Sequence, residues 1–147
     1  LKYSGRKFVT ILPNNDPGFK EIWRVIEALP KNQFRVIPSM RFSYFSELMK
    51  NSSAIVGNSS AGVREAPFLG LPSLDIGSRQ RARSAADSVT NCQPNDKEKI
   101  LHFLENSWGK SYPRDESFGA GRTAEKFLKI LNSRAFWEND IQKIFNE

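Results

Sequence analysis

The sequence has little of what a disulfide framework or a zinc site requires. Its 147 residues include one cysteine, Cys92, and one histidine, His102. A single cysteine excludes an internal disulfide, and one histidine beside it excludes a Cys/His zinc cluster. We therefore expect no metal ion, and no cofactor is predicted either. The same low cysteine content predicts a reducing, cytoplasmic location.

Long hydrophobic runs are also missing. No apolar stretch approaches the roughly 18 residues that a membrane-spanning helix needs, and residues 1–7 do not form the apolar segment of a signal peptide. We therefore expect no membrane partner and no secretion. The first residue is leucine rather than methionine, which is compatible with a fragment or a processed chain.

Negative charge is in deficit. The chain has 22 Lys and Arg against 16 Asp and Glu, a formal net charge of +6, which suits an anionic ligand. The positive residues are spread along the chain, and the tightest group is Arg79, Arg81 and Arg83. This pattern lacks the continuous basic stripe of a duplex-binding protein. It favours a small phosphorylated ligand, with no nucleic-acid partner.

The length and composition are those of one compact domain. A chain of 147 residues with 39% hydrophobic and 26% charged residues has the usage of a globular protein with a single core. We expect one domain over residues 1–147, in which residues 132–147 form a C-terminal helical extension.

Short β-rich runs alternate with helical patterns along most of the chain. The predicted strands span residues 7–12, 34–37, 53–57, 74–76 and 88–90. Helices are predicted from apolar side chains at helical spacing, at residues 16–29, 42–49, 60–68, 96–104, 122–131 and 136–145, with a loop at 108–121. This alternation predicts an α/β, Rossmann-like fold in which helices flank a parallel sheet.

The loop at residues 57–62, Gly-Asn-Ser-Ser-Ala-Gly, has the composition of an anion site. It joins a predicted strand to a predicted helix, where parallel sheets bind ligands and helix N–H groups are unpaired. Backbone amides and the Ser59 and Ser60 hydroxyls could hold a phosphate there. The same residues are typical of a tight turn and helix N-cap, so both interpretations stay open.

Two common nucleotide motifs are absent. The loop at 57–62 is followed by Val63 and Arg64, where a Walker A motif requires Lys and Ser or Thr. The chain also lacks a G-x-G-x-x-G sequence. An NTPase and a dinucleotide-dependent enzyme are therefore not indicated.

Two charged residues are predicted to lie near this loop. Glu65, early in the predicted helix, could accept hydrogen bonds from ribose hydroxyls, although an acidic residue there also stabilises a helix dipole. Arg79 follows the next predicted strand at the same edge of the sheet, and its guanidinium suits phosphate oxygens. Arg81 and Arg83 are more typical of a solvated loop. His102 has no catalytic pattern around it, so no catalytic residue is predicted.

Three segments closely resemble the UDP-N-acetylglucosamine 2-epimerases, particularly the hydrolysing branch of sialic acid biosynthesis. They are Arg41-Phe42, the run GNSSAGVREAPFLGLPSLDIGSRQRAR at residues 57–83, and LPNNDPG at residues 12–18. The resemblance covers most of residues 6–131. It implies the UDP-binding C-terminal half of a GT-B enzyme that acts on UDP-N-acetylglucosamine. The implied partners are the N-terminal domain of the same enzyme and further copies in a homo-oligomer.

The resemblance also implies a role for individual residues. Ser59 and Ser60 match positions that hold the diphosphate, Glu65 matches the position that binds the ribose hydroxyls, and Arg79 matches a position lining the UDP site. The uracil and its surroundings correspond to three further residues: Asn14 in a nucleotide-contacting loop, Met40 through its backbone, and Phe45 through its ring.

The family reaction removes the C2 proton of the sugar while UDP leaves, and water then adds to give N-acetylmannosamine. The family's acid and base residues precede the segment that this sequence matches, so we expect the isolated chain to be inactive. A GT-B glycosyltransferase uses similar diphosphate and ribose sites, and its nucleotide-sugar domain is the alternative. A nucleotide-sensing or protein-interaction module is the non-enzymatic hypothesis.

Overall fold

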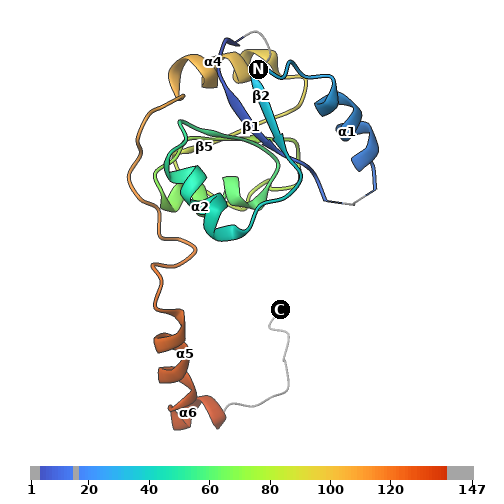
Figure 1. The fold of residues 1–147 in the computed structure, drawn as a ribbon. Helices are drawn as coiled ribbons and strands as arrows, with labels where there is room; N and C mark the ends of the chain where they lie inside the picture. The colour runs from blue at the N-terminus through green and yellow to red at the C-terminus, as the bar shows by residue number, and fades with distance from the viewer. Residues whose placement is uncertain (1–3, 15–16, 139–147) are drawn as a thin grey trace, which may run out of the picture. The chain divides into compact units, whose positions relative to one another are not determined.

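A computed structural model describes residues 4–14 and 17–138, which belong to two compact units (Figure 1). The first unit extends to Asp115 and the second begins at Glu116. The elements of the first unit are β1 (Phe8–Ile11), α1 (Phe19–Glu27), β2 (Phe34–Ile37), α2 (Phe42–Lys50), β3 (Ile55–Gly57), a 3₁₀ turn (Ser60–Gly62), α3 (Glu65–Phe68), β4 (Ser73–Ile76), β5 (Val89–Cys92) and α4 (Lys97–Asn106).

The strands of the first unit form two parallel sheets. β1 pairs with β2, with Phe8 opposite Phe34, while β4 lies between β3 and β5, with Ser73 opposite Ile55 and Val89. The predicted parallel α/β fold with flanking helices is thus confirmed. The single predicted sheet is divided, because no strand pairing within residues 4–14 and 17–138 joins β1 or β2 to the other three.

Helical segments pack on both faces of the three-stranded sheet. On one face Leu74 of β4 packs in a cluster with Phe103 and Leu104 of α4. On the other face the 3₁₀ turn lies so close that a Cβ on Gly62 would come within 2.7 Å of the Ser73 Oγ. A second cluster joins α2, the 3₁₀ turn and α3 through Met49, Ala61, Ala66 and Leu71.

The predicted helix at residues 60–68 is wrong as a continuous element. The chain makes a 3₁₀ turn at Ser60–Gly62 and starts the four-residue helix α3 at Glu65. Pro67 gives the physical reason. Its ring clashes with the carbonyl four residues earlier in a helix interior, but it is tolerated in the first turn, where it lies in α3.

The other predicted elements of the first unit are confirmed with shifted ends. α1 begins at Phe19 rather than at residue 16, which lies outside the described residues, and Gly18 precedes it with a left-handed φ of 88°. The predicted strand at 88–90 lies one to two residues further on, at Val89–Cys92. Asp96 caps α4 by accepting a hydrogen bond from the Lys99 amide at 3.0 Å.

The first part of the predicted loop after α4 is held by backbone hydrogen bonds to segments next to the three-stranded sheet. The Gly109 amide donates to the Ser53 carbonyl at 2.9 Å, and the Tyr112 amide donates to the Gly70 carbonyl at 3.0 Å. The Asp115 amide donates to the Pro67 carbonyl at 3.1 Å. We call residues 109–115 the strap, because its backbone bonds hold the turns before β3 and β4.

The second unit contains α5 (Thr123–Leu131) and α6 (Arg134–Trp137). α5 agrees with the predicted helix at 122–131, and the Trp137 Nε1 donates to the Leu131 carbonyl at 2.7 Å. The predicted helix at 136–145 falls mostly on residues 139–147, which lie outside the described residues. The single domain over 1–147 and its extension at 132–147 stay predictions.

Candidate functional site

A cavity of about 720 Å³ lies between the two sheets of the first unit. One side is formed by apolar side chains of β1 and α1, among them Ile11, Ile22 and Ile26. The other side is formed by β3 and the residues that follow it, including Gly57 and Asn58. This volume is within the range of small-molecule sites, which are largely apolar with a few polar groups.

Residues predicted from the sequence meet at this cavity. The cavity is lined by Asn14, Met40, Phe45, Ser59 and Arg79, which come from five separate parts of the chain. Four of them follow β1, β2, β3 and β4, so they lie beyond the carboxyl ends of strands from both sheets, where ligands bind in parallel α/β folds. The fold thus brings together five of the seven predicted residues, and their roles in binding stay predictions.

The remaining two predicted residues, Ser60 and Glu65, do not line the cavity. Ser60 begins the 3₁₀ turn and Glu65 begins α3. The Oε2 atom of Glu65 is buried and has no hydrogen-bond partner among the described residues. A buried carboxylate oxygen without a donor is costly, so this atom has unused capacity to accept a hydrogen bond.

The backbone amides of the loop at residues 57–62 were expected to be free to bind a phosphate, but two of them are bonded within the loop. The Ser59 Oγ accepts a hydrogen bond from the Ala61 amide at 3.3 Å, and the Gly62 amide donates to the Ser59 carbonyl at 3.0 Å. The interpretation of this loop as a turn with a side-chain cap therefore holds in the structure. Because a 3₁₀ turn and a four-residue helix have a small dipole, the positive charge near the cavity comes mainly from Arg79.

A buried carboxylate lies beside this loop in the sheet. Asp75 of β4 is opposite Gly57 of β3, its side chain is 2% exposed, and neither carboxylate oxygen has a hydrogen-bond partner among the described residues. Burial raises the pKa of the Asp75 carboxyl above its ordinary value, because a charged group is disfavoured away from water. Protonation of Asp75 would remove a negative charge next to the loop at 57–62.

Gln80 is a residue whose role the sequence did not reveal. It is 2% exposed, its Nε2 donates to the Asn58 carbonyl at 3.1 Å, and its Oε1 accepts from the Arg83 Nη1 at 3.1 Å. It therefore joins the loop after β3 to the loop after β4. A glutamine between arginines carries no burial signal, and only the family resemblance of residues 57–83 covered its position.

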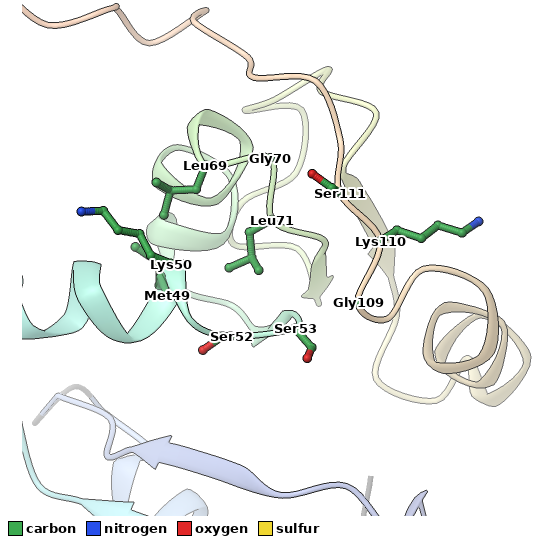
Figure 2. Close-up of a pocket in the computed structure, with 10 residues that line it drawn as sticks. All are labelled: Met49, Lys50, Ser52, Ser53, Leu69, Gly70, Leu71, Gly109, Lys110 and Ser111. Carbon is green, nitrogen blue, oxygen red and sulfur yellow. The ribbon is translucent and has the colours of Figure 1, made fainter.

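A second cavity, of about 260 Å³, lies near the strap (Figure 2). It is bordered by Met49, Leu71 and Ser111, and by Lys50 and Lys110. Figure 2 shows both lysine ammonium groups directed away from Leu71, and the Lys50 Nζ pairs with Glu47 at 2.6 Å. No charged group converges on this cavity, so we do not assign it a ligand.

Within the described part of the chain, no group of three or more His, Cys, Asp or Glu side chains is arranged to hold a metal ion. The described helices are also too short or too polar to cross a membrane.

A family model described as UDP-N-acetylglucosamine 2-epimerase matches residues 1–132. The chain belongs to this family. The family resemblance inferred from residues 12–18 and 57–83 is thereby confirmed. The family favours an epimerase over a glycosyltransferase domain or an interaction module.

Curated relatives agree with the family assignment. A UDP-N-acetylglucosamine 2-epimerase from Neisseria meningitidis serogroup B is 37% identical over 150 residues, covering 99% of this chain and 39% of the relative. A UDP-N,N'-diacetylbacillosamine 2-epimerase (hydrolyzing) from Legionella pneumophila is 29% identical, covering 86% of this chain and 34% of the relative. Polysialic acid biosynthesis protein P7 of Escherichia coli is 28% identical, covering 85% of this chain and 35% of the relative. The chain thus spans about two fifths or less of these relatives.

Proposed function

We propose that this chain is the UDP-binding part of a UDP-N-acetylglucosamine 2-epimerase of the hydrolysing type, which gives N-acetylmannosamine and UDP. The observation that carries the proposal is the cavity at the carboxyl ends of the strands, where Asn14, Met40, Phe45, Ser59 and Arg79 converge. The hydrolysing activity named for the Legionella relative supports this outcome.

The lining of the cavity suits the two ends of a nucleotide. Met40 and Phe45 are half-buried at the cavity, where the Phe45 ring offers an apolar face for the uracil and the Met40 backbone offers it polar groups. Ser59 and Arg79 are exposed at the same cavity and offer a hydroxyl and a guanidinium for the diphosphate. We therefore assign the base to the side of α2 and the diphosphate to the loops after β3 and β4.

The chemistry of the reaction requires groups that this cavity lacks. Removing the sugar C2 proton and protonating the departing diphosphate need a base and an acid. No aspartate, glutamate, histidine or cysteine is among the described residues that line the cavity. We infer that this chain binds and orients UDP, and that a further domain of the enzyme, in a GT-B arrangement, supplies the proton-transfer groups.

Titration of the ¹⁵N-labelled chain with UDP tests the proposal. We expect saturable shifts of the Asn14, Met40 and Ser59 amides, with weak affinity because only part of the cleft is present. A longer protein containing this chain should release N-acetylmannosamine from UDP-N-acetylglucosamine without any acceptor. Formation of a glycoside would instead indicate a transferase, and an absence of UDP binding to the longer protein would indicate an interaction module.

The ribose assignment to Glu65 has its own test. Glu65→Gln in the longer protein should weaken UDP binding by about 1–3 kcal/mol, the usual cost of losing a charged hydrogen-bond partner. Glu98→Gln, at the first turn of α4, is the control for the loss of one negative charge. Calorimetry that gives equal UDP affinities for both variants would contradict the ribose role.

A further inference from the structure

Gln80 ties together two loops that each contribute a residue to the cavity. Its bond to the Asn58 carbonyl spans 22 positions of sequence. Asn58, itself a lining residue, precedes Ser59, and Gln80 follows Arg79, so the bond fixes positions next to both Ser59 and Arg79. Gln80 itself does not line the cavity.

The burial and chemistry of this side chain suit a tie between two loops. Gln80 is 2% exposed and its two hydrogen bonds are partly buried, and an amide hydrogen bond that is shielded from water is stronger than one at the surface. The side-chain amide of glutamine has both a donor and an acceptor. Its nitrogen donates to the Asn58 carbonyl, and its oxygen accepts from the Arg83 guanidinium. Methionine has nearly the same shape but cannot donate.

The loop after β4 needs such a tie because part of its backbone is unfavourable. Ala82 has a φ of 59°, a left-handed conformation that residues with a Cβ seldom adopt. Surrounding bonds must hold a backbone of this kind in place. The two side-chain bonds of Gln80 lie directly beside this position.

We propose that Gln80 is a positioning residue that sets the separation of Ser59 and Arg79 for a diphosphate. This inference rests on the proposed UDP site and adds a residue that touches no ligand. Because the tied loops meet the diphosphate and not the base, losing the tie should weaken UDP binding and leave uridine binding nearly unchanged.

The ratio of UDP to uridine affinity separates positioning from a general loss of fold. A partly unfolded variant has a smaller competent fraction, which lowers the apparent affinity for both ligands by the same factor. A displaced diphosphate site lowers the affinity for UDP alone. The selectivity ratio therefore reports the position of the two loops.

The test compares Gln80→Met with the wild-type chain in NMR titrations of UDP and of uridine. We expect Gln80→Met to lose about tenfold in UDP affinity, which corresponds to the loss of one hydrogen bond, and less than about twofold for uridine. Gln93→Met is the matched control, because Gln93 is exposed in the loop after β5. It should keep both affinities.

An unchanged UDP-to-uridine ratio in Gln80→Met would overturn the positioning role. If that variant does not fold, Gln80→Leu replaces it, since it is of similar size, lacks the amide donor and adds no charge beside the diphosphate. A wild-type ratio in Gln80→Leu would equally overturn the proposal. Absence of UDP binding by the wild-type chain and by the longer protein is a different result, because it removes the proposed function itself.

Discussion

The two sheets of the first unit differ in how completely their side chains are buried. The three-stranded sheet has Leu74 at its centre, and two clusters of buried residues pack on it or beside it. The two-stranded sheet and α1 keep Val9, Ile22 and Val36 substantially exposed, and α1 has no buried residue. Stability is therefore concentrated in the β3–β4–β5 half.

The difference bears on how the site is built. The apolar side chains of β1 and α1 that lack close packing are among those that line the cavity. The better packed half instead carries the loops after β3 and β4, which bring the polar residues. A rigid sheet thus positions the proposed diphosphate end, while a less constrained half forms the apolar wall.

The largest expected effect comes from the centre of the packed half. Leu74 is 0% exposed and Ile22 is 49% exposed. Leu74→Ala should lower the free energy of unfolding by about 2–5 kcal/mol, and Ile22→Ala, which removes the same number of carbons, by less than about 1 kcal/mol. Urea denaturation measures both. Equal losses would mean that the two halves share one core.

The strap provides a second contrast within the packed half. Gly70 has a φ of 65°, and a Cβ there would collide with the Tyr112 carbonyl oxygen, whereas Gly109 has a φ of 75° and open space around its Cβ position. Gly70→Ala should therefore cost about 2–4 kcal/mol, against about 1 kcal/mol for Gly109→Ala, which has backbone strain alone. Thermal unfolding compares them. Matching values would mean that the strap moves away freely.

Local signals in the sequence predicted most of the fold. The strand at residues 34–37 has the bounds of β2, and the Asp96 side chain caps α4 near the predicted start. The break before α3 was also predictable, because Pro67 cannot lie deep inside a helix. These features depend on neighbours in sequence, and propensity and spacing report such neighbours.

Tertiary features were not predictable in the same way. The division into two sheets depends on which strand edges meet, and no local pattern encodes that. The burial of Gln80 and Asp75 depends on loops and strands that are distant in sequence. The place of Asn14 and Met40 at the site was implied by the family resemblance alone, while that of Arg79 was also predicted from its position after a strand.

Asp75 gives a pH-dependent contrast with the rest of the packed half. Its pKa is raised above the ordinary 3.8 by burial, so the folded state holds this proton more tightly than the unfolded state. The stability from that proton is fully present below the unfolded-state pKa and is lost as pH rises through the folded-state pKa. The amide of Asp75→Asn does not ionise, so no buried charge forms as the pH rises. The variant should therefore be more stable than wild type at neutral pH by about 1–3 kcal/mol.

Urea titrations from about pH 4 to 8 measure this difference. The advantage of Asp75→Asn should shrink toward low pH, where the wild-type carboxyl is neutral in both states. Asp87→Asn, at an exposed aspartate before β5, is the control for removing one negative charge. An advantage that is constant with pH would mean that the effect is one of packing and not of the buried charge.

The smallest expected effect concerns the contact between the two halves. The Arg6 guanidinium lies 5.0 Å from the centre of the Trp108 ring, and its Nη2 donates to the Leu104 carbonyl at 2.7 Å. Arg6→Met should cost about 1 kcal/mol, since a half-buried charged hydrogen bond is lost but the apolar stem remains. Lys7→Met, whose Nζ donates to the exposed Asn32 carbonyl at 2.8 Å, is the control and should cost less.

Amide hydrogen exchange tells where the loss from Arg6→Met falls. Arg6 joins the start of β1 to the end of α4, so its removal should speed exchange in β1 and β2 and leave β3, β4 and β5 protected. This outcome is expected if the packed half is stable without the two-stranded sheet, since local opening then needs less free energy than global unfolding. Faster exchange in all five strands would instead mean that the two halves unfold together.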